Sequence, residues 1–352
     1  MQNPSFFNVS NLSISYDNQQ VVDDVSFDLA EGELACLLGP SGCGKTTILR
    51  AISGFQTLNS GTIELGGKLL ANTQQSIAPE SRNVGMVFQD HALFPHLSVY
   101  ENVCFGLKKL PRSEQQKRIA DLLNLVGIEQ HKNKYPHELS GGQSQRVAIA
   151  RAIAPQPKLL LMDEPFSNLD SELRESLGYE VRDLLKQLKV TAIMVTHDQL
   201  DAFALGDQVG VMSNGRLMQW DSSFNLYHAP KNRFTANFIG EGTFIKGHMI
   251  EGNVVITPFG EIKGQTVNTP FVGQDVDLLL RPDDIKHNAN SEIRCKIIRK
   301  AFKGAQTLYT VEHVSGSILM CLAPSHDDFE VGDIIGLEID ADHLVCFDQQ
   351  KI

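Results

Sequence analysis

Long apolar stretches are missing from this sequence. No segment approaches the ~18 uninterrupted apolar residues that a membrane-spanning helix needs. The first ten residues, MQNPSFFNVS, lack the basic-then-apolar layout of a signal peptide. We therefore expect that the chain does not cross a bilayer. If the protein works at a membrane, other chains must hold it there.

Positive charge and paired cysteines are also scarce. Lys and Arg number 31 against 42 Asp and Glu, so the net charge is −11. This balance disfavours a basic surface for nucleic acid, and we expect no nucleic-acid partner. No two of the six cysteines have the C-x-x-C spacing of a zinc or redox site. Reduced, mostly buried thiols are the simpler expectation, and they favour a cytosolic compartment.

The 352 residues leave room for one large domain and a smaller one. Residues 1–240 alternate between strand-like and helix-like stretches, which predicts an α/β domain with a parallel sheet. The segment 6–29 alternates in polarity and predicts an antiparallel β piece. Within the α/β part we expect strands at 34–38, 84–88, 159–162 and 191–195, and helices at 44–52, 113–126, 144–154 and 172–188.

The composition changes after residue 240. The stretch FIGEGTFIKG is rich in glycine, and the remainder reads mainly as short strands at the spacing of a small barrel or sandwich. We place a boundary near Phe238–Gly242. The expected domains are 1–240, with the α/β fold, and 241–352, which is all β.

The segment from Gly39 to Thr46 matches the pattern G-x-x-x-x-G-K-[ST] at every fixed position. It also lies between an expected strand and an expected helix, as the phosphate-binding loop requires. Glycines let backbone N–H groups surround phosphates, Lys45 adds a point charge, and the Thr46 hydroxyl can ligate Mg²⁺. A chance glycine turn is the much weaker alternative. The candidate nucleotide-binding residues are Gly39, Pro40, Ser41, Gly42, Cys43, Gly44, Lys45, Thr46 and Thr47; Cys43 occupies a free position and has no expected chemical role.

Two adjacent carboxylates end the apolar run LLLMDEP. Ligands of an open parallel sheet bind beyond the carboxyl ends of its strands. Asp163 can therefore face Mg²⁺, and Glu164 can polarise an attacking water as general base. Alone, the pair could be solvated loop acids. The complete loop at Lys45 favours the functional interpretation.

A second glycine-rich helix start, Leu139-Ser-Gly-Gly-Gln143, has no lysine. Helix N-termini bind anions, but this one lacks the groups that would hold a magnesium nucleotide by itself. It could complete a site on a second copy of the chain. It could equally be a helix cap made by Ser140 beside flexible glycines.

LSGGQ, placed between the Lys45 loop and LLLMDEP, resembles the ABC ATPase family over about residues 5–240. The resemblance implies a head-to-tail dimer that holds two Mg²⁺-bound ATP molecules between its subunits. Lys45 of one copy would then face Ser140, Gly142 and Gln143 of the other. It also implies that Glu164 and the two residues Gln89 and His197 are catalytic, and that Thr46, Gln89 and Asp163 bind the metal.

Further positions match the family one by one. Tyr16 resembles the aromatic residue that stacks on adenine, although an ordinary strand tyrosine remains the alternative. Gln89 resembles the glutamine that touches Mg²⁺ and senses the membrane partner, and LFPHLSVYENV resembles the surface that receives the permease. Asp170 ends a segment that resembles the D-loop, where Asn168 replaces a frequent Ala and is expected to be tolerated. His197 resembles the histidine that contacts the γ-phosphate.

The C-terminal β segment resembles the TOBE-type domain of binding-protein-dependent importers. The resemblance implies two transmembrane permease subunits as partners, a periplasmic binding protein as an indirect one, and a peripheral position on the cytoplasmic face of the inner membrane. KYPHELSGGQ and the FIGEG linker most resemble ferric-iron importers. Polyamine, sulfate, molybdate or sugar are the alternative cargoes. A soluble ABC ATPase without a transport role is the rival from another class.

Overall fold

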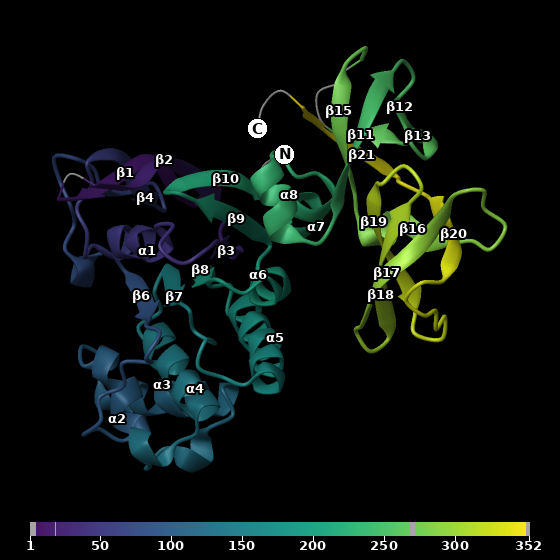
Figure 1. Cartoon of the computed structure of the whole chain (residues 1–352). Helices are drawn as coiled ribbons and strands as arrows, with labels where there is room; N and C mark the ends of the chain where they lie inside the picture. Colours follow the sequence, from purple (N-terminus) through teal and green to yellow (C-terminus); the bar gives the residue numbers. More distant parts are fainter. Residues whose placement is uncertain (1–4, 18, 268–271, 350–352) are drawn as a thin grey trace. The chain divides into compact units, whose positions relative to one another are not determined.

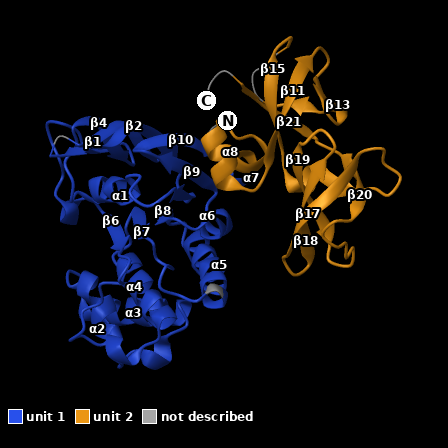
Figure 2. Ribbon diagram, viewed as in Figure 1, with its two compact units in different colours: residues 1–223 blue, residues 224–352 orange. Residues whose placement is uncertain are grey.

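A computed structural model describes residues 5–17, 19–267 and 272–349. The chain divides into two compact units, residues 1–223 and residues 224–352 (Figure 2). The second unit includes two short helices that precede the all-β segment. The domain boundary predicted at 240/241 falls between the last of these helices and the first strand after it, and it stays a prediction.

The first unit is built on a six-stranded sheet with the order β10-β9-β3-β8-β7-β6 (Figure 1). The pairs β9–β3, β3–β8, β8–β7 and β7–β6 are parallel, and β10 is antiparallel to β9. Continuous apolar sequences form the central strands because both faces of these strands are buried. The strands are β3 (Leu34–Leu38), β6 (Val84–Val87), β7 (Leu159–Asp163), β8 (Thr191–Thr196), β9 (Gln208–Ser213) and β10 (Arg216–Asp221).

A second sheet of this unit has the order β2-β1-β4-β5 and is antiparallel, as the alternation in residues 6–29 predicts. Asn11 has φ 49° and marks a shift in register, so the buried side chains change from Val9 to Leu12 without leaving the core. One apolar cluster joins both sheets through the buried face of α1. The strands are β1 (Phe7–Tyr16), β2 (Gln19–Leu29), β4 (Ser60–Leu65) and β5 (Lys68–Ala71).

The four helices expected in the first unit lie close to their predicted positions, with one correction, whereas α2 and α6 were not predicted. The helix expected at 144–154 starts three residues earlier, because Ser140 caps it and both glycines lie inside its first turn. The α-helices are α1 (Lys45–Ser53), α2 (Val99–Cys104), α3 (Arg112–Leu125), α4 (Gly141–Ile153), α5 (Ser171–Gln187) and α6 (Gln199–Leu205). Short 3₁₀ turns are η1 (Pro79–Ser81), η2 (Phe105–Leu107), η3 (Glu129–His131) and η4 (Pro136–Glu138).

The helix α7 (Ser223–His228) begins at the last residue of the first unit, and the second unit continues with α8 (Arg233–Ile239) and two sheets. Their orders are β13-β12-β11-β15-β21-β14 and β16-β20-β17-β18-β19. The inner faces share one apolar core, and this confirms the predicted all-β C-terminal segment. The elements are β11 (Thr243–Ile250), β12 (Val254–Thr257), β13 (Gly260–Lys263), β14 (Gln265–Thr266), β15 (Asp275–Leu280), η5 (Pro282–Asp284), β16 (Ile285–His287), β17 (Arg294–Phe302), β18 (Gln306–His313), β19 (Ile318–Pro324), β20 (Ile334–Ile339) and β21 (His343–Asp348).

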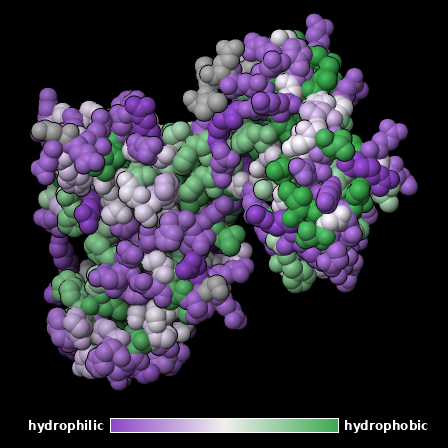
Figure 3. All heavy atoms as spheres, in the orientation of Figure 1, coloured by the Kyte–Doolittle hydropathy of each residue, from purple (hydrophilic) through white to green (hydrophobic). Residues whose placement is uncertain are grey.

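Polar and apolar side chains are mixed over the face of the molecule that Figure 3 shows. All six cysteines are free thiols, and five of them are buried, as expected from their spacing. Burial raises the pKa of the Cys295 and Cys321 thiols to about 11, so both stay protonated near neutral pH. Among the described helices, none is long and apolar enough to cross a membrane.

Candidate functional site

Four segments predicted to carry chemistry leave the sheet of the first unit at the same edge. Because β3, β8, β7 and β6 are parallel, their carboxyl ends lie side by side. The register places Leu38 opposite Thr196, Val195 opposite Asp163, and Met162 opposite Val87. The loop containing Lys45, then His197, Glu164 and Gln89, follow directly on these strands. The spacing of these four segments along the sequence does not show that they are close in space; the strand order does.

The glycine-rich loop connects β3 to α1, and two of its glycines are required by the backbone. Gly44 caps α1 with φ 102°, a conformation that side chains disfavour. A Cβ at Gly44 would lie 2.8 Å from the backbone oxygen of Val21. A Cβ at Gly39 would lie 2.4 Å from the backbone oxygen of Met212. The loop therefore packs against neighbouring backbone and holds its N–H groups at the start of the helix.

Lys45 is only 5% exposed and is turned back onto its own loop. Its Nζ donates to the carbonyl oxygens of Gly39, at 2.7 Å, and Pro40, at 3.0 Å. These carbonyls solvate the ammonium group in a site where water has little access. A phosphate entering the loop offers the ammonium a charged acceptor in their place.

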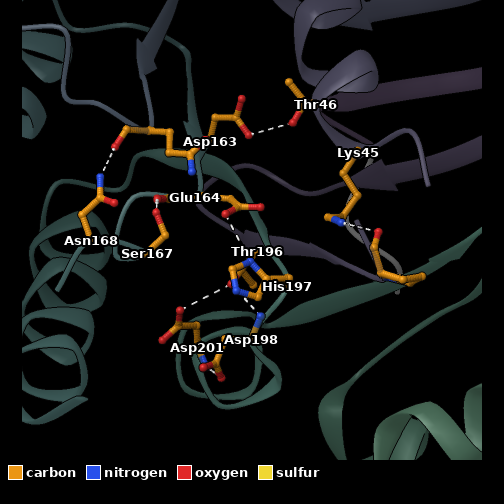
Figure 4. Close-up of polar contacts among 12 residues, drawn as sticks. Lys45, Thr46, Asp163, Glu164, Ser167, Asn168, Thr196, His197, Asp198 and Asp201 are labelled. Atoms are coloured by element: carbon orange, nitrogen blue, oxygen red, sulfur yellow. Dashed lines mark hydrogen bonds and ion pairs between the residues drawn. The ribbon is translucent and has the colours of Figure 1, made fainter. Parts of the chain in front are cut away.

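Thr46 and Asp163 meet across the sheet edge, as Figure 4 shows. The Thr46 hydroxyl donates to Asp163 Oδ1 at 3.1 Å. Burial raises the pKa of Asp163, the neighbouring Glu164 charge raises it further, and the Thr46 hydroxyl acts in the opposite direction. A hydroxyl and a carboxylate crowded by a second carboxylate form an oxygen donor set that fits Mg²⁺. Gln89 lies just beyond the end of β6 and is exposed.

Glu164 and His197 form a second pair at this edge. His197 Nδ1 lies 3.1 Å from Glu164 Oε2. Glu164 has φ 43°, a left-handed conformation that costs energy for a residue with a side chain. Its N–H donates to the Val195 carbonyl at 2.9 Å, which fixes the strained residue against β8. The glutamate is thereby held beside the histidine.

The LSGGQ segment starts α4 with a capping box. The Ser140 hydroxyl accepts from the Gln143 N–H, and the Gln143 side-chain oxygen accepts from the Ser140 N–H at 3.0 Å. The cap is thus present, and no described contact uses the Ser140 hydroxyl proton, which can therefore donate to an anion. Gly142 is buried, and a Cβ there would lie 3.1 Å from the Leu173 side chain. Figure 1 shows α4 grouped with α2 and α3, apart from α1.

The structure does not test the roles predicted for two other residues, Tyr16 and Asp170. Tyr16 ends β1 and is 39% exposed. Asp170 caps α5 by accepting from the Leu173 N–H at 2.9 Å. No described contact joins either residue to the glycine-rich loop. Stacking on adenine by Tyr16 and nucleotide contact by Asp170 therefore remain predictions.

Sequence reasoning missed a polar group next to His197. Asp198 caps α6 and accepts from Arg174 of α5 at 2.9 Å. Arg174 also donates to the Leu169 carbonyl at 3.3 Å. Asp201, in the first turn of α6, accepts from the Thr196 hydroxyl at 3.4 Å. The capping pattern of Asp198 was visible in the sequence, whereas its partner on α5 was not.

We expect Asp201→Asn to stabilise the protein at neutral pH. Burial and the charge of Asp198 raise the pKa of Asp201 to about 6, against an ordinary value of about 4. The folded state therefore holds this proton more tightly, and wild-type stability falls as the pH rises through 4 to 6. Tm of the variant should exceed the wild-type Tm at pH 7.5, and the difference should shrink towards pH 4. A Tm difference independent of pH would contradict this account.

An α/β domain with this loop between a strand and a helix defines a P-loop nucleotide-binding protein. The family model described as ABC transporter matches residues 22–167, and the model described as TOBE domain matches residues 278–347. The chain belongs to the ABC transporter family. The resemblance predicted from LSGGQ is thus confirmed, as is the fold of both segments.

The similar curated proteins are import ATP-binding proteins. The spermidine/putrescine import ATP-binding protein PotA of Marinobacter nauticus is 41% identical, with 88% of this chain and 85% of that protein covered. PotA of Thermotoga maritima is 41% identical, with 85% and 79% covered. The Fe(3+) ions import ATP-binding protein FbpC of Vibrio cholerae is 39% identical, with 92% of each chain covered.

A similar solved structure is cbiO1 of Clostridium perfringens, described as part of the ABC transporter complex cbiONQ. The TM-score is 0.58 and the sequence identity is 32%. The match covers 67% of this chain and 92% of cbiO1. This likeness supports the ABC ATPase fold of the chain.

Proposed function

We propose that this chain is the ATP-hydrolysing subunit of an ABC importer, and that it works as a dimer. The observation that carries the proposal is the meeting of two pairs at one sheet edge. Thr46 lies 3.1 Å from Asp163, and Glu164 lies 3.1 Å from His197. Both pairs include a residue at the carboxyl end of β7, and β8, which lies between β7 and β3, ends directly before His197. The arrangement combines an anion-binding loop at Lys45, a candidate metal site at Thr46 and Asp163, and a candidate base at Glu164.

Each residue has a defined task in this proposal. Lys45 would exchange its loop carbonyls for the β- and γ-phosphates, and Thr46, Asp163 and Gln89 would hold Mg²⁺. When bound, Mg²⁺ neutralises charge on those phosphates. Glu164 gives up its hydrogen bond from His197 and accepts one from the attacking water. His197 is then free to donate towards the γ-phosphate.

The helix that starts at LSGGQ is the reason for proposing a second copy of the chain. Ser140, Gly142 and Gln143 present an anion-binding helix start without a lysine. We propose that they complete the site of the partner copy, and that Tyr16 stacks on adenine. Gln89 and the LFPHLSVYENV surface would transmit closure to two permease subunits. The chain would then lie at the cytoplasmic face of the inner membrane.

Ferric iron and polyamines are the two cargoes that the relatives support. FbpC of Vibrio cholerae is named for Fe(3+) ions, and both PotA proteins are named for spermidine and putrescine. The sequence identities are close and favour neither cargo. In either system a periplasmic binding protein and the permease would contact the cargo, while this chain would supply the energy.

We expect the chain to support ATP-dependent uptake of one of these cargoes. Cells that lack the chain would be given labelled ferric iron or labelled spermidine, with wild-type protein or Lys45→Ala restored. Uptake of one label that requires Lys45 assigns the cargo, because the ammonium group is needed for nucleotide binding. Co-purification with ribosomes instead of a permease, and no effect on uptake, would favour the soluble ATPase.

A further inference from the structure

The turn from Glu164 to Asp170 is tied firmly to the candidate base. The Ser167 hydroxyl donates to the Glu164 carbonyl at 3.0 Å, and the Ser167 N–H donates to the same oxygen at 3.3 Å. The Leu169 N–H donates to the Phe166 carbonyl at 3.1 Å. These bonds fix the backbone of the turn relative to Glu164.

Asn168 extends from this turn to another segment of the site. Its amide nitrogen donates to the Gln89 carbonyl at 3.1 Å (Figure 4). A carbonyl can only accept, so the side-chain NH₂ must be the donor. An alanine at this position could not make the bond. From the sequence we expect Asn168 to be merely tolerated in place of alanine, but the structure shows that its side chain makes a specific contact.

The segment that receives this bond is strained. After Gln89, His91 has φ 62° and Ala92 has φ 46°, both in the left-handed region. Arg151 of α4 donates to the carbonyls of His91, at 2.9 Å, and Ala92, at 2.7 Å. The strained stretch is thus held by Arg151 on one side. The bond from Asn168 fixes the backbone at Gln89 itself.

The opposite side of the turn is tied to the neighbour of His197. Arg174 donates to the Leu169 carbonyl and to Asp198, which follows His197 directly. The turn of Glu164 therefore contacts the Gln89 segment through Asn168 and the His197 segment through Arg174. The contact with the Gln89 segment depends on the Asn168 side chain, whereas the contact with the His197 segment also includes the Glu164 side chain.

We propose that Asn168 is a positioning residue that sets Gln89 relative to Glu164. The proposal rests on the proposed ATPase function and adds a residue to it. By holding the Gln89 backbone, Asn168 limits how far the glutamine side chain can move relative to Asp163 and Glu164. The proposal assigns Asn168 a bond to the Gln89 backbone and no contact with the nucleotide or the metal.

The test is a double-mutant cycle in Mg²⁺-dependent ATP hydrolysis by the full chain. Asn168→Ala should lower kcat about 3- to 10-fold, the range expected for loss of one hydrogen bond. KM for ATP should stay unchanged, and the Mg²⁺ concentration for half-maximal rate should rise. Asn168→Asp should be affected at least as strongly, since a carboxylate cannot donate to the Gln89 carbonyl. Asn124→Ala, at an exposed position on α3, is the control and should behave as wild type.

In a Gln89→Ala background, Asn168→Ala should change kcat by less than about twofold, because its effect passes through Gln89. An equal loss in both backgrounds, or wild-type kinetics of Asn168→Ala, would overturn the proposal. A melting curve of each variant separates misfolding from a kinetic effect. If the wild-type chain does not hydrolyse Mg²⁺-ATP, the proposed function fails, and this inference fails with it. Hydrolysis without coupling between the two positions refutes the inference alone.

Discussion

Replacing Glu164 by Gln is expected to lower kcat for ATP hydrolysis by about 10²- to 10⁴-fold, the usual contribution of a positioned general base. The amide fits the same space and can still pair with His197, but it cannot take a proton from water. Steady-state phosphate release with purified protein measures the effect. Glu175→Gln, which makes the same charge change on the exposed side of α5, should retain normal turnover.

The same variant should still bind ATP, because Lys45 and Thr46 are unchanged. With hydrolysis stopped, the ATP-bound dimer should accumulate, and light scattering after gel filtration would detect it. Normal turnover of Glu164→Gln would refute the assignment of the base. Loss of nucleotide binding would show that Glu164 supports the loop and does not act on water.

Arg82→Met is expected to destabilise the first unit by about 3–5 kcal/mol, as loss of a buried charged hydrogen-bonding group does. The Arg82 side chain is 2% exposed. Its guanidinium donates to the carbonyls of Ala51, at 2.7 Å, and Ile52, at 2.8 Å, in the last turn of α1. It also donates to the Ile77 carbonyl at 2.7 Å and to the Ser76 hydroxyl at 2.7 Å. Methionine fills much of the volume but removes the donors of all four bonds, and only the Ala51 carbonyl keeps a second described donor, the Gly54 N–H at 3.2 Å.

The measurement is urea unfolding of the full chain, followed by tryptophan fluorescence. Arg112→Met, at an exposed arginine that starts α3, is the matched control and should change stability little. Because α1 also carries Lys45 and Thr46, Arg82→Met should weaken ATP binding as well. A stability equal to that of the control would mean that water replaces the guanidinium without cost.

Much of the first unit could be predicted from the sequence. The strand at 34–38 is found at those residues, because an apolar run of five bounded by glycine has few alternatives. The helices at 113–126 and 172–188 each lie within one residue of their expected ends. The sequence places the start of α4 three residues too late, because glycines are typical of loops, whereas Ser140 caps the helix ahead of both glycines.

The site divides in the same way. Lys45, Thr46, Asp163 and Glu164 stand in local patterns whose chemistry requires those residue types, and the sequence predicts them without any contact. Arg82, Arg174 and Asn168 carry no such signal. A lone arginine before a strand, or an asparagine in a turn, reads as a solvated residue until its partner is known.

The sequence by itself determined the family, the alternation of strands and helices, and the residues of the phosphate loop. These depend on neighbours within a few positions along the chain, where turn, cap and periodicity act. Only the tertiary structure decided which residues meet. The parallel register brings Thr46 to Asp163, 117 positions apart, and Asn168 to Gln89, 79 positions apart. Such contacts depend on the order of strands in the sheet, which no local pattern encodes.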